Sequence, residues 1–216
     1  MLAKKHLQAL HTSFYPILKE YIASLAAAKV PADRQVLLQS LAAFIRDKWA
    51  QGETARLNFI CTHNSRRSQF AQLWAATLAA WHGLERLACY SGGTEATALY
   101  PQVAAAMQEA GFRVVQMSEA ANPLYHFYYA EGGPAIEAFS KVYNHAANPQ
   151  QGFAAVMTCS EAEEACPVVI GAAARISLSY EDPKLYDNTA QEAAAYRQRC
   201  RQIAAELNFV FDQLKE

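Results

Sequence analysis

The segment from Cys61 to Ser68 brings a thiol, two guanidinium groups and several hydroxyl and amide side chains together in a short stretch. It follows an apolar run, residues 57–60, and precedes a helical pattern. Backbone N–H groups at such a strand-to-helix junction form an anion cradle, and a cysteine beside it is stabilised as a thiolate. Arg67 can offer two donors to the oxygens of one anion. The pattern predicts that Cys61 is a nucleophile that attacks a bound tetrahedral oxyanion.

The whole loop is expected to line this anion site, with Ser68 donating a hydrogen bond to the thiolate. A cysteine and an arginine at this spacing also occur by chance, as a buried thiol and a surface cation. The strand–loop–helix context and the turn residues within it favour the functional interpretation. The predicted substrate-binding residues are Thr62, His63, Asn64, Ser65, Arg66, Arg67 and Ser68.

The loop resembles the signature of the low-molecular-weight protein tyrosine phosphatase superfamily, which includes one class of arsenate reductases. The resemblance covers residues 56–214, and residues 91–96 are similar to the family's second-strand motif. The matching loop residues are Phe59-Ile60-Cys61-Thr62-x-Asn64-Ser65-x-Arg67-Ser68-Gln69.

Asp182-Pro183 is similar to the dipeptide that supplies the family's general acid. The resemblance therefore implies that Asp182 protonates the departing oxygen, from a loop that Pro183 stiffens. Taken alone, Asp-Pro is also common in ordinary turns. Glu181 and Asp187 are the local alternatives for the acid.

Two further cysteines follow an apolar run, residues 153–157, that is expected to form a strand. Because the carboxyl ends of parallel strands share one sheet edge, we expect Cys159 to emerge beside Cys61. In a helix, Cys159 and Cys166 would be separated by ~10.5 Å of rise, whereas a disulfide needs Cα atoms within roughly 7 Å. The pair can bridge only if the segment unwinds, which Pro167 makes easier.

This cysteine spacing resembles the redox pair of the thioredoxin-coupled arsenate reductases. The resemblance implies a relay in which Cys61 attacks arsenate, Cys159 attacks the Cys61–arsenic adduct, and Cys166 attacks Cys159 before thioredoxin restores the thiols. The first alternative is hydrolysis of phosphotyrosine or a small phosphate ester, which needs Cys61, Arg67 and Asp182 only. The second is a redox-sensing or oxyanion-binding regulator without turnover.

The sequence departs from the family pattern at four places. Arg66 stands where the reductases often have cysteine, and it adds positive charge to the loop. His63 stands where the family has glycine, so a positive φ there would be strained. Gln72 stands where the potassium-binding reductases carry a carboxylate, so we expect no potassium site. No clustered Cys/His ligand set suggests another metal, and we expect no cofactor. The segment 118–151 is unusually long, and its aromatic residues are expected to form either a lid over the site or a satellite core. These aromatic and histidine residues are Tyr125, His126, Tyr128 and Tyr129.

The elements that must position these residues alternate short strands with amphipathic helices, which predicts a three-layer α/β sandwich with a central parallel sheet. The expected strands are 57–60, 87–90, 112–115, 153–157 and 175–178, and the expected helices are 68–81, 101–111 and 189–214. Residues 1–52 are expected to form an N-terminal helical hairpin, packed on the domain or on a second copy. Its second helix should begin with Asp33 as N-cap. Residues 53–216 form the predicted catalytic domain.

Composition limits the classes of function. The 216 residues are 52% hydrophobic with a formal charge of −1, and Lys and Arg form no blocks, so no nucleic-acid-binding surface is expected. No apolar run reaches the ~20 residues that span a bilayer, and no secretory signal is visible. Five cysteines without clustered metal-binding spacing suit a reducing cytoplasm. Cys89 is expected to be a buried hydrophobe and Cys200 to lie on a solvated helix face.

Overall fold

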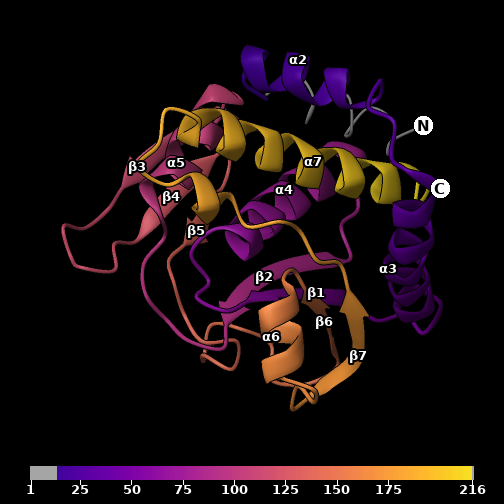
Figure 1. Cartoon of the computed structure of the whole chain (residues 1–216). Coiled ribbons are helices and arrows are strands. Elements are labelled where there is room, and N and C mark those ends of the chain that lie inside the picture. Colours follow the sequence, from indigo (N-terminus) through magenta and orange to yellow (C-terminus); the bar gives the residue numbers. More distant parts are fainter. Residues whose placement is uncertain (1–13, 216) are drawn as a thin grey trace.

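The computed structural model describes residues 14–215 (Figure 1). Its centre is a sheet of four parallel strands in the order β2-β1-β6-β7. Four of the five expected strands are found here, and each begins within three residues of its expected first residue. They are β1 (Ala55–Cys61), β2 (Leu87–Gly93), β6 (Phe153–Met157) and β7 (Ala172–Ser177).

The strand register brings the chemically active residues to one edge of the sheet. Cys61 pairs with Gly93 on one side of β1, and Ile60 pairs with Met157 on the other. The backbone N–H of Thr158 then donates to the carbonyl of Ile60 at 2.7 Å. Cys159, the next residue, therefore leaves the sheet beside the strand that ends in Cys61.

Helices cover both sides of the sheet. Figure 1 shows α4 and α7 stacked on one side and α6 on the other, which confirms the expected three-layer α/β architecture. Most of α4 is buried between the sheet and α7, so its apolar residues extend around the helix. The helical segments of this region are α4 (Arg67–His82), α5 (Pro101–Glu109), α6 (Ser160–Ala165), the 3₁₀ turn η1 (Pro183–Tyr186) and α7 (Glu192–Asp212).

The expectation that residues 112–115 join the parallel sheet is wrong. They form β3, the edge of a separate antiparallel sheet of order β3-β4-β5. A strand of four residues with no fully buried position has too little apolar surface to occupy a central sheet. Its partners come from the segment that was expected to be irregular. The three strands are β3 (Arg113–Gln116), β4 (Tyr125–Tyr128) and β5 (Ile136–Ala138).

The aromatic segment around β4 packs partly in the main core and does not border the cleft beside the Cys61 loop. Tyr125 and Phe127 are buried in the main hydrophobic cluster, and Tyr129 packs against it. His126 and Tyr128 alternate with them on the other face of the strand, where their rings meet edge to face. None of these residues lines the cleft beside the Cys61 loop.

The N-terminal hairpin is present as α2 (Pro16–Leu25) and α3 (Ala32–Ala50), and Leu7 and Leu10 of the expected first helix lie outside the described residues. The N-cap of α3 is Pro31, not Asp33, because the extended backbone of Pro31 already precedes the helix. Asp33 instead lies in the first turn, where a carboxylate still favours the helix dipole.

The hairpin packs on the rest of the chain, one of the two arrangements expected for it. Leu18, Ile22, Leu38, Leu41 and Ile45 have at most 2% of their surface exposed and belong to the same core cluster as the sheet and α7. The division at residue 52 into an extension and a catalytic domain stays a prediction. Among residues 14–215, no helix has both the length and the apolar character needed to cross a membrane.

Because the hairpin shares the core, we expect Leu41→Ala to lower the free energy of unfolding of the whole chain by about 2–5 kcal/mol. Urea unfolding followed by both tryptophan fluorescence and circular dichroism should show one transition, shifted to lower urea. Val36→Ala is the matched control on the same helix, since Val36 is 71% exposed, and it should change the unfolding free energy by less than ~0.5 kcal/mol. Two separate transitions would show that the hairpin unfolds on its own.

Candidate active site

The loop between β1 and α4 has the form of an anion site. β1 ends at Cys61, and α4 begins at Arg67. Within residues 14–215, the backbone N–H groups of residues 62–66 have no protein acceptor, so they are available to an anion at the start of the helix.

The Cys61 thiol is held by a short chain of hydrogen bonds. Its sulfur lies 3.0 Å from the Ser68 hydroxyl oxygen, as expected. That oxygen accepts a hydrogen bond of 2.8 Å from the Asn64 side-chain amide, so the Ser68 proton is free to point at the sulfur. The backbone N–H of Lys141 donates to the Asn64 amide oxygen at 3.0 Å, which fixes the orientation of that amide. Ser68 can therefore stabilise a Cys61 thiolate.

The strained backbone position in the loop is Asn64 and not His63. Asn64 has φ of 46°, and His63 is not among the residues with positive φ. Asparagine adopts this left-handed region more readily than most residues, so the replacement of glycine by His63 costs no backbone strain. The His63 ring lies 3.7 Å from the exposed carboxylate of Glu95, and its carbonyl accepts a hydrogen bond from Ser140.

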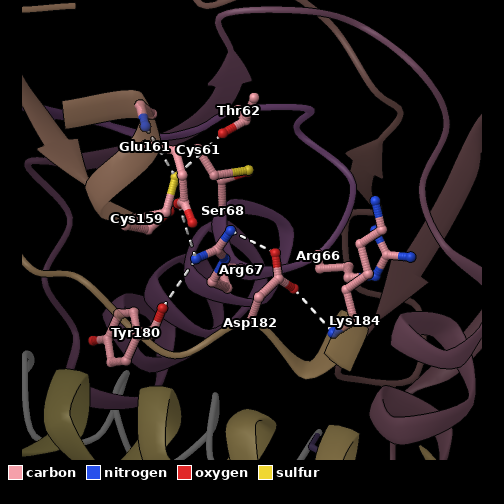
Figure 2. Close-up of polar contacts among 12 residues, drawn as sticks. Cys61, Thr62, Arg66, Arg67, Ser68, Cys159, Glu161, Tyr180, Asp182 and Lys184 are labelled. Atoms are coloured by element: carbon pink, nitrogen blue, oxygen red, sulfur yellow. Dashed lines mark hydrogen bonds and ion pairs between the residues drawn. The ribbon is translucent and has the colours of Figure 1, made fainter. Parts of the chain in front are cut away.

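Arg67 is buried, and its two terminal guanidinium nitrogens meet acceptors from the segment after β7 and from α6 (Figure 2). One nitrogen lies 2.6 Å from a carboxylate oxygen of Asp182. The other donates to the carbonyl of Tyr180 at 3.0 Å and lies 3.7 Å from the carboxylate of Glu161. Asp182 is thus held at the site where an oxyanion would bind.

The two alternative acids are directed elsewhere. Glu181 is exposed and pairs with Arg199 at 3.1 Å. Asp187 is 2.6 Å from Arg66 and accepts a hydrogen bond of 2.7 Å from the Tyr196 hydroxyl. Of these three carboxylates, Asp182 is the one in contact with Arg67.

Arg66 lies apart from the thiol. Its guanidinium is directed away from Cys61 (Figure 2). It stacks over the ring of Tyr100, at 4.1 Å from the centroid. It borders a cleft of about 320 Å³ beside the loop. The cleft is lined by His63, Ser65, Arg66, Thr97, Ala98, Leu99, Tyr100, Pro101 and Lys184.

Cys159 and Cys166 occupy the two ends of α6. Cys159 is the N-cap, is completely buried, and lies 3.6 Å from the Thr62 hydroxyl. Its sulfur also accepts from the backbone N–H of Ala162 at 3.4 Å. Burial raises the pKa of the Cys159 thiol, while Thr62 and Arg67 act in the opposite direction. Cys166 is the half-buried C-cap.

Sequence reasoning missed two charged residues around the loop. Glu161 reaches Arg67, and its position two residues after a cysteine at a strand end was the available signal. Lys141 is buried behind the loop, and burial lowers the pKa of its ammonium group to about 8. Nothing local in the sequence indicates that Lys141 is buried.

The expectation for Cys200 is wrong, whereas Cys89 packs against the core as expected. Cys200 is buried and accepts a hydrogen bond of 3.2 Å from the Trp74 indole. It lies on the face of α7 that packs on α4, while Arg197 and Arg201 lie on the exposed face. Burial raises the pKa of the Cys200 thiol to about 12.

Comparisons with known proteins agree with this architecture. A model of the family described as low molecular weight phosphotyrosine protein phosphatase matches residues 56–130. The arsenate reductase of Bacillus licheniformis is 30% identical over 143 residues, which are 66% of this chain and 84% of that protein.

Two solved structures share the fold at low sequence identity. A mutant of YwlE from Bacillus subtilis has a TM-score of 0.50 at 16% identity, over 75% of this chain and 99% of that one. A low molecular weight protein tyrosine phosphatase from T. tengcongensis also has a TM-score of 0.50, at 12% identity, over 74% and 99%. These likenesses confirm the expected fold.

The contact between β2 and the Cys61 loop generates a prediction for Gly93. A Cβ atom there would lie 2.6 Å from the carbonyl oxygen of Thr62 and 2.8 Å from the backbone nitrogen of Asn64. We expect Gly93→Ala to displace the loop and weaken oxyanion binding by up to about 100-fold, the cost of a misplacement near 1 Å. Phosphate protection of Cys61 from alkylation measures this affinity.

Gly133→Ala is the matched control for that substitution. A Cβ atom at Gly133 meets the Ala130 side chain at 3.2 Å and no residue of the loop, so phosphate affinity should not change. Unchanged phosphate affinity in Gly93→Ala would contradict the prediction, because oxyanion binding would then tolerate a side chain at this position.

Proposed function

The chain belongs to the low-molecular-weight phosphotyrosine protein phosphatase family, and within it we propose that this protein reduces arsenate to arsenite through Cys61, Cys159 and Cys166. The observation that carries the proposal is the position of Cys159. A buried thiol next to Thr62, at the end of the strand beside β1, has no use in a simple ester hydrolase. A second thiol lies at the other end of the same six-residue helix.

In the proposed first step, arsenate binds to the backbone N–H groups of the loop and to the guanidinium of Arg67. The Asp182 carboxyl leaves Arg67 and turns toward the departing oxygen. The Cys61 thiolate attacks arsenic, a sulfur–arsenic bond forms, and an arsenic–oxygen bond breaks. Asp182 gives its proton to that oxygen, which leaves as water.

In the second step the Cys159 thiolate attacks the sulfur of Cys61. A Cys61–Cys159 disulfide forms, the sulfur–arsenic bond breaks, and its electron pair stays on arsenic, which is reduced from As(V) to As(III). Cys166 then attacks Cys159, so that Cys61 leaves as a thiolate and Cys159–Cys166 becomes the disulfide. A dithiol donor of the thioredoxin type, in a reducing cytoplasm, is the proposed reductant of that disulfide.

A second candidate activity is hydrolysis of a phosphate monoester by Cys61, Arg67 and Asp182. The cleft of about 320 Å³ beside the loop favours it, because arsenate alone leaves this space empty whereas the alcohol part of an ester would occupy it. Arg66 and Lys184 line the cleft, so an ester with an additional anionic group would be preferred.

The relay predicts coupled turnover. With arsenate, thioredoxin, thioredoxin reductase and NADPH, the protein should oxidise NADPH, because each cycle ends in a disulfide that thioredoxin reduces. Cys159→Ser and Cys166→Ser should each abolish turnover, and Cys166→Ser treated with arsenate should accumulate Cys61–Cys159, detected by mass spectrometry of non-reduced peptides.

Cys89→Ser is the control, since that thiol packs against the core and should not affect the rate beyond a change in stability. Absence of arsenate-dependent NADPH oxidation, with p-nitrophenyl phosphate hydrolysis that Cys61→Ser abolishes and Cys159→Ser does not, would favour the phosphatase activity instead.

The raised pKa of Cys159 predicts the pH dependence of the second step. Only the thiolate attacks, and a raised pKa leaves less thiolate at neutral pH, so the rate should increase with pH, by about tenfold per unit below that pKa. Rapid-quench measurement of Cys61–Cys159 formation in Cys166→Ser, after arsenate addition, follows this step alone. Thr62→Val removes a group that lowers the pKa of Cys159 and should shift the profile to higher pH. A rate independent of pH from 6.5 to 9 would contradict a step limited by thiolate formation.

A further inference from the structure

We propose that Arg34, on helix α3 of the N-terminal hairpin, is a positioning residue for the oxyanion site. It holds the segment Ser179–Asp182, which supplies two of the acceptors around Arg67. The inference rests on the proposed oxyanion-binding function of Arg67, and it is the same whether arsenate or a phosphate ester is the substrate.

The guanidinium of Arg34 makes contacts on all of its sides. Two of its nitrogens donate to the carboxylate of Glu206 on α7, at 3.1 and 2.6 Å. The third donates to the carbonyl of Ser179 at 3.1 Å, and the group lies 4.9 Å from the centre of the Tyr180 ring. The side chains of Arg34 and Glu206 are 15% and 3% exposed. Such a shielded bidentate pair fixes the position of the guanidinium, and the carbonyl of Ser179 is bound to it.

The residues next to Ser179 bind the catalytic loop. The carbonyl of Tyr180 accepts from Arg67 at 3.0 Å, and the Asp182 carboxylate lies 2.6 Å from the same guanidinium. Three residues within four positions of the chain are therefore linked: Ser179 is held by α3, Tyr180 binds Arg67, and Asp182 is the proposed acid. A shift of Ser179 would be passed to both acceptors of Arg67.

This segment has little regular structure of its own. β7 ends at Ser177 and η1 begins at Pro183. Between them, the backbone N–H groups of Leu178 and Tyr180 donate to Met157 and Thr158 on one side only. Arg34 and Glu206 supply the support on the opposite side, from two helices that are themselves packed in the core. The hairpin thus contributes to the geometry of the active site without touching the substrate.

The test compares two arginines of the same helix. Arg34→Met combined with Glu206→Gln removes both charges, so no buried carboxylate is left unpaired. Arg46→Met is the matched control, because Arg46 also reaches from α3 to the C-terminal end of α7, where it donates to the carbonyl of the C-cap residue Gln213 and not to the segment Ser179–Asp182. The measurement is the phosphate concentration that protects Cys61 from iodoacetamide at one fixed pH, with the melting temperature determined in parallel.

We expect the double variant to need about tenfold more phosphate for protection than the wild type, as for a modest displacement of ligand-binding groups, while Arg46→Met matches the wild type. Arg34→Lys keeps the charge but has one donor nitrogen in place of three, so it loses the bidentate pair with Glu206 and should lie between the two. This milder variant carries the test if the double variant does not fold.

Wild-type phosphate affinity in the double variant or in Arg34→Lys would overturn the inference, whatever the melting temperature of the variant. Arg34 would then have a role in stability alone. An equal loss of affinity in Arg46→Met would also overturn it, because the effect would then come from general loosening of α3. Wild-type protein that phosphate does not protect at all would instead contradict the proposed oxyanion site, and the inference would fall with it.

Discussion

One guanidinium, that of Arg67, is the point at which the separate parts of the site meet. It is the first residue of α4, and its acceptors come from the connection after β7 and from α6. Two carboxylates, those of Asp182 and Glu161, lie within 4 Å of its single positive charge. A bound dianion would add to this negative charge, so one carboxylate has to move or take up a proton. Asp182, the acid that we propose for the leaving oxygen, is the carboxylate that lies closer to Arg67, at 2.6 Å.

The arrangement around Arg67 depends on close backbone approaches at the end of β2. Gly93 accepts from Tyr143 and donates to Lys141, both at 2.8 Å, and Lys141 in turn binds the Asn64 amide. The long segment after β3 therefore supports the back of the Cys61 loop, although its aromatic strand packs in the core. A side chain at Gly93 would separate these elements, which explains why glycine is needed at a position with an ordinary φ.

The sequence was sufficient to predict the local structure where a residue's type and its neighbours in the chain determine that structure. Apolar runs located the four parallel strands, and the residues between Cys61 and Ser68 predicted the strand–loop–helix junction and the contact between these two side chains, because both depend on local spacing. That this loop binds an anion stays a prediction. The sequence was insufficient where the residues in contact are far apart along the chain. Arg34 contacts residues 145 and 172 positions away, and no local pattern marks it. The helical period of α7 could be read from the sequence. Which face of that helix packs on α4, and therefore whether Cys200 is buried, is decided by tertiary packing.

The short helix α6 has the properties that exchange between its two thiols would require. A disulfide between its N-cap and C-cap residues needs the helix to unwind, since seven residues of helix span ~10.5 Å. Only a few hydrogen bonds hold it, among them those from Glu163 to the carbonyl of Cys159 and from Cys166 to that of Ala162. At ~0.5–1.5 kcal/mol each, their loss is small beside the ~5–15 kcal/mol that stabilises a typical domain. Unwinding α6 would also withdraw Glu161 from Arg67. In the proposed relay, a change in the state of the thiols would therefore also change the number of carboxylates around Arg67.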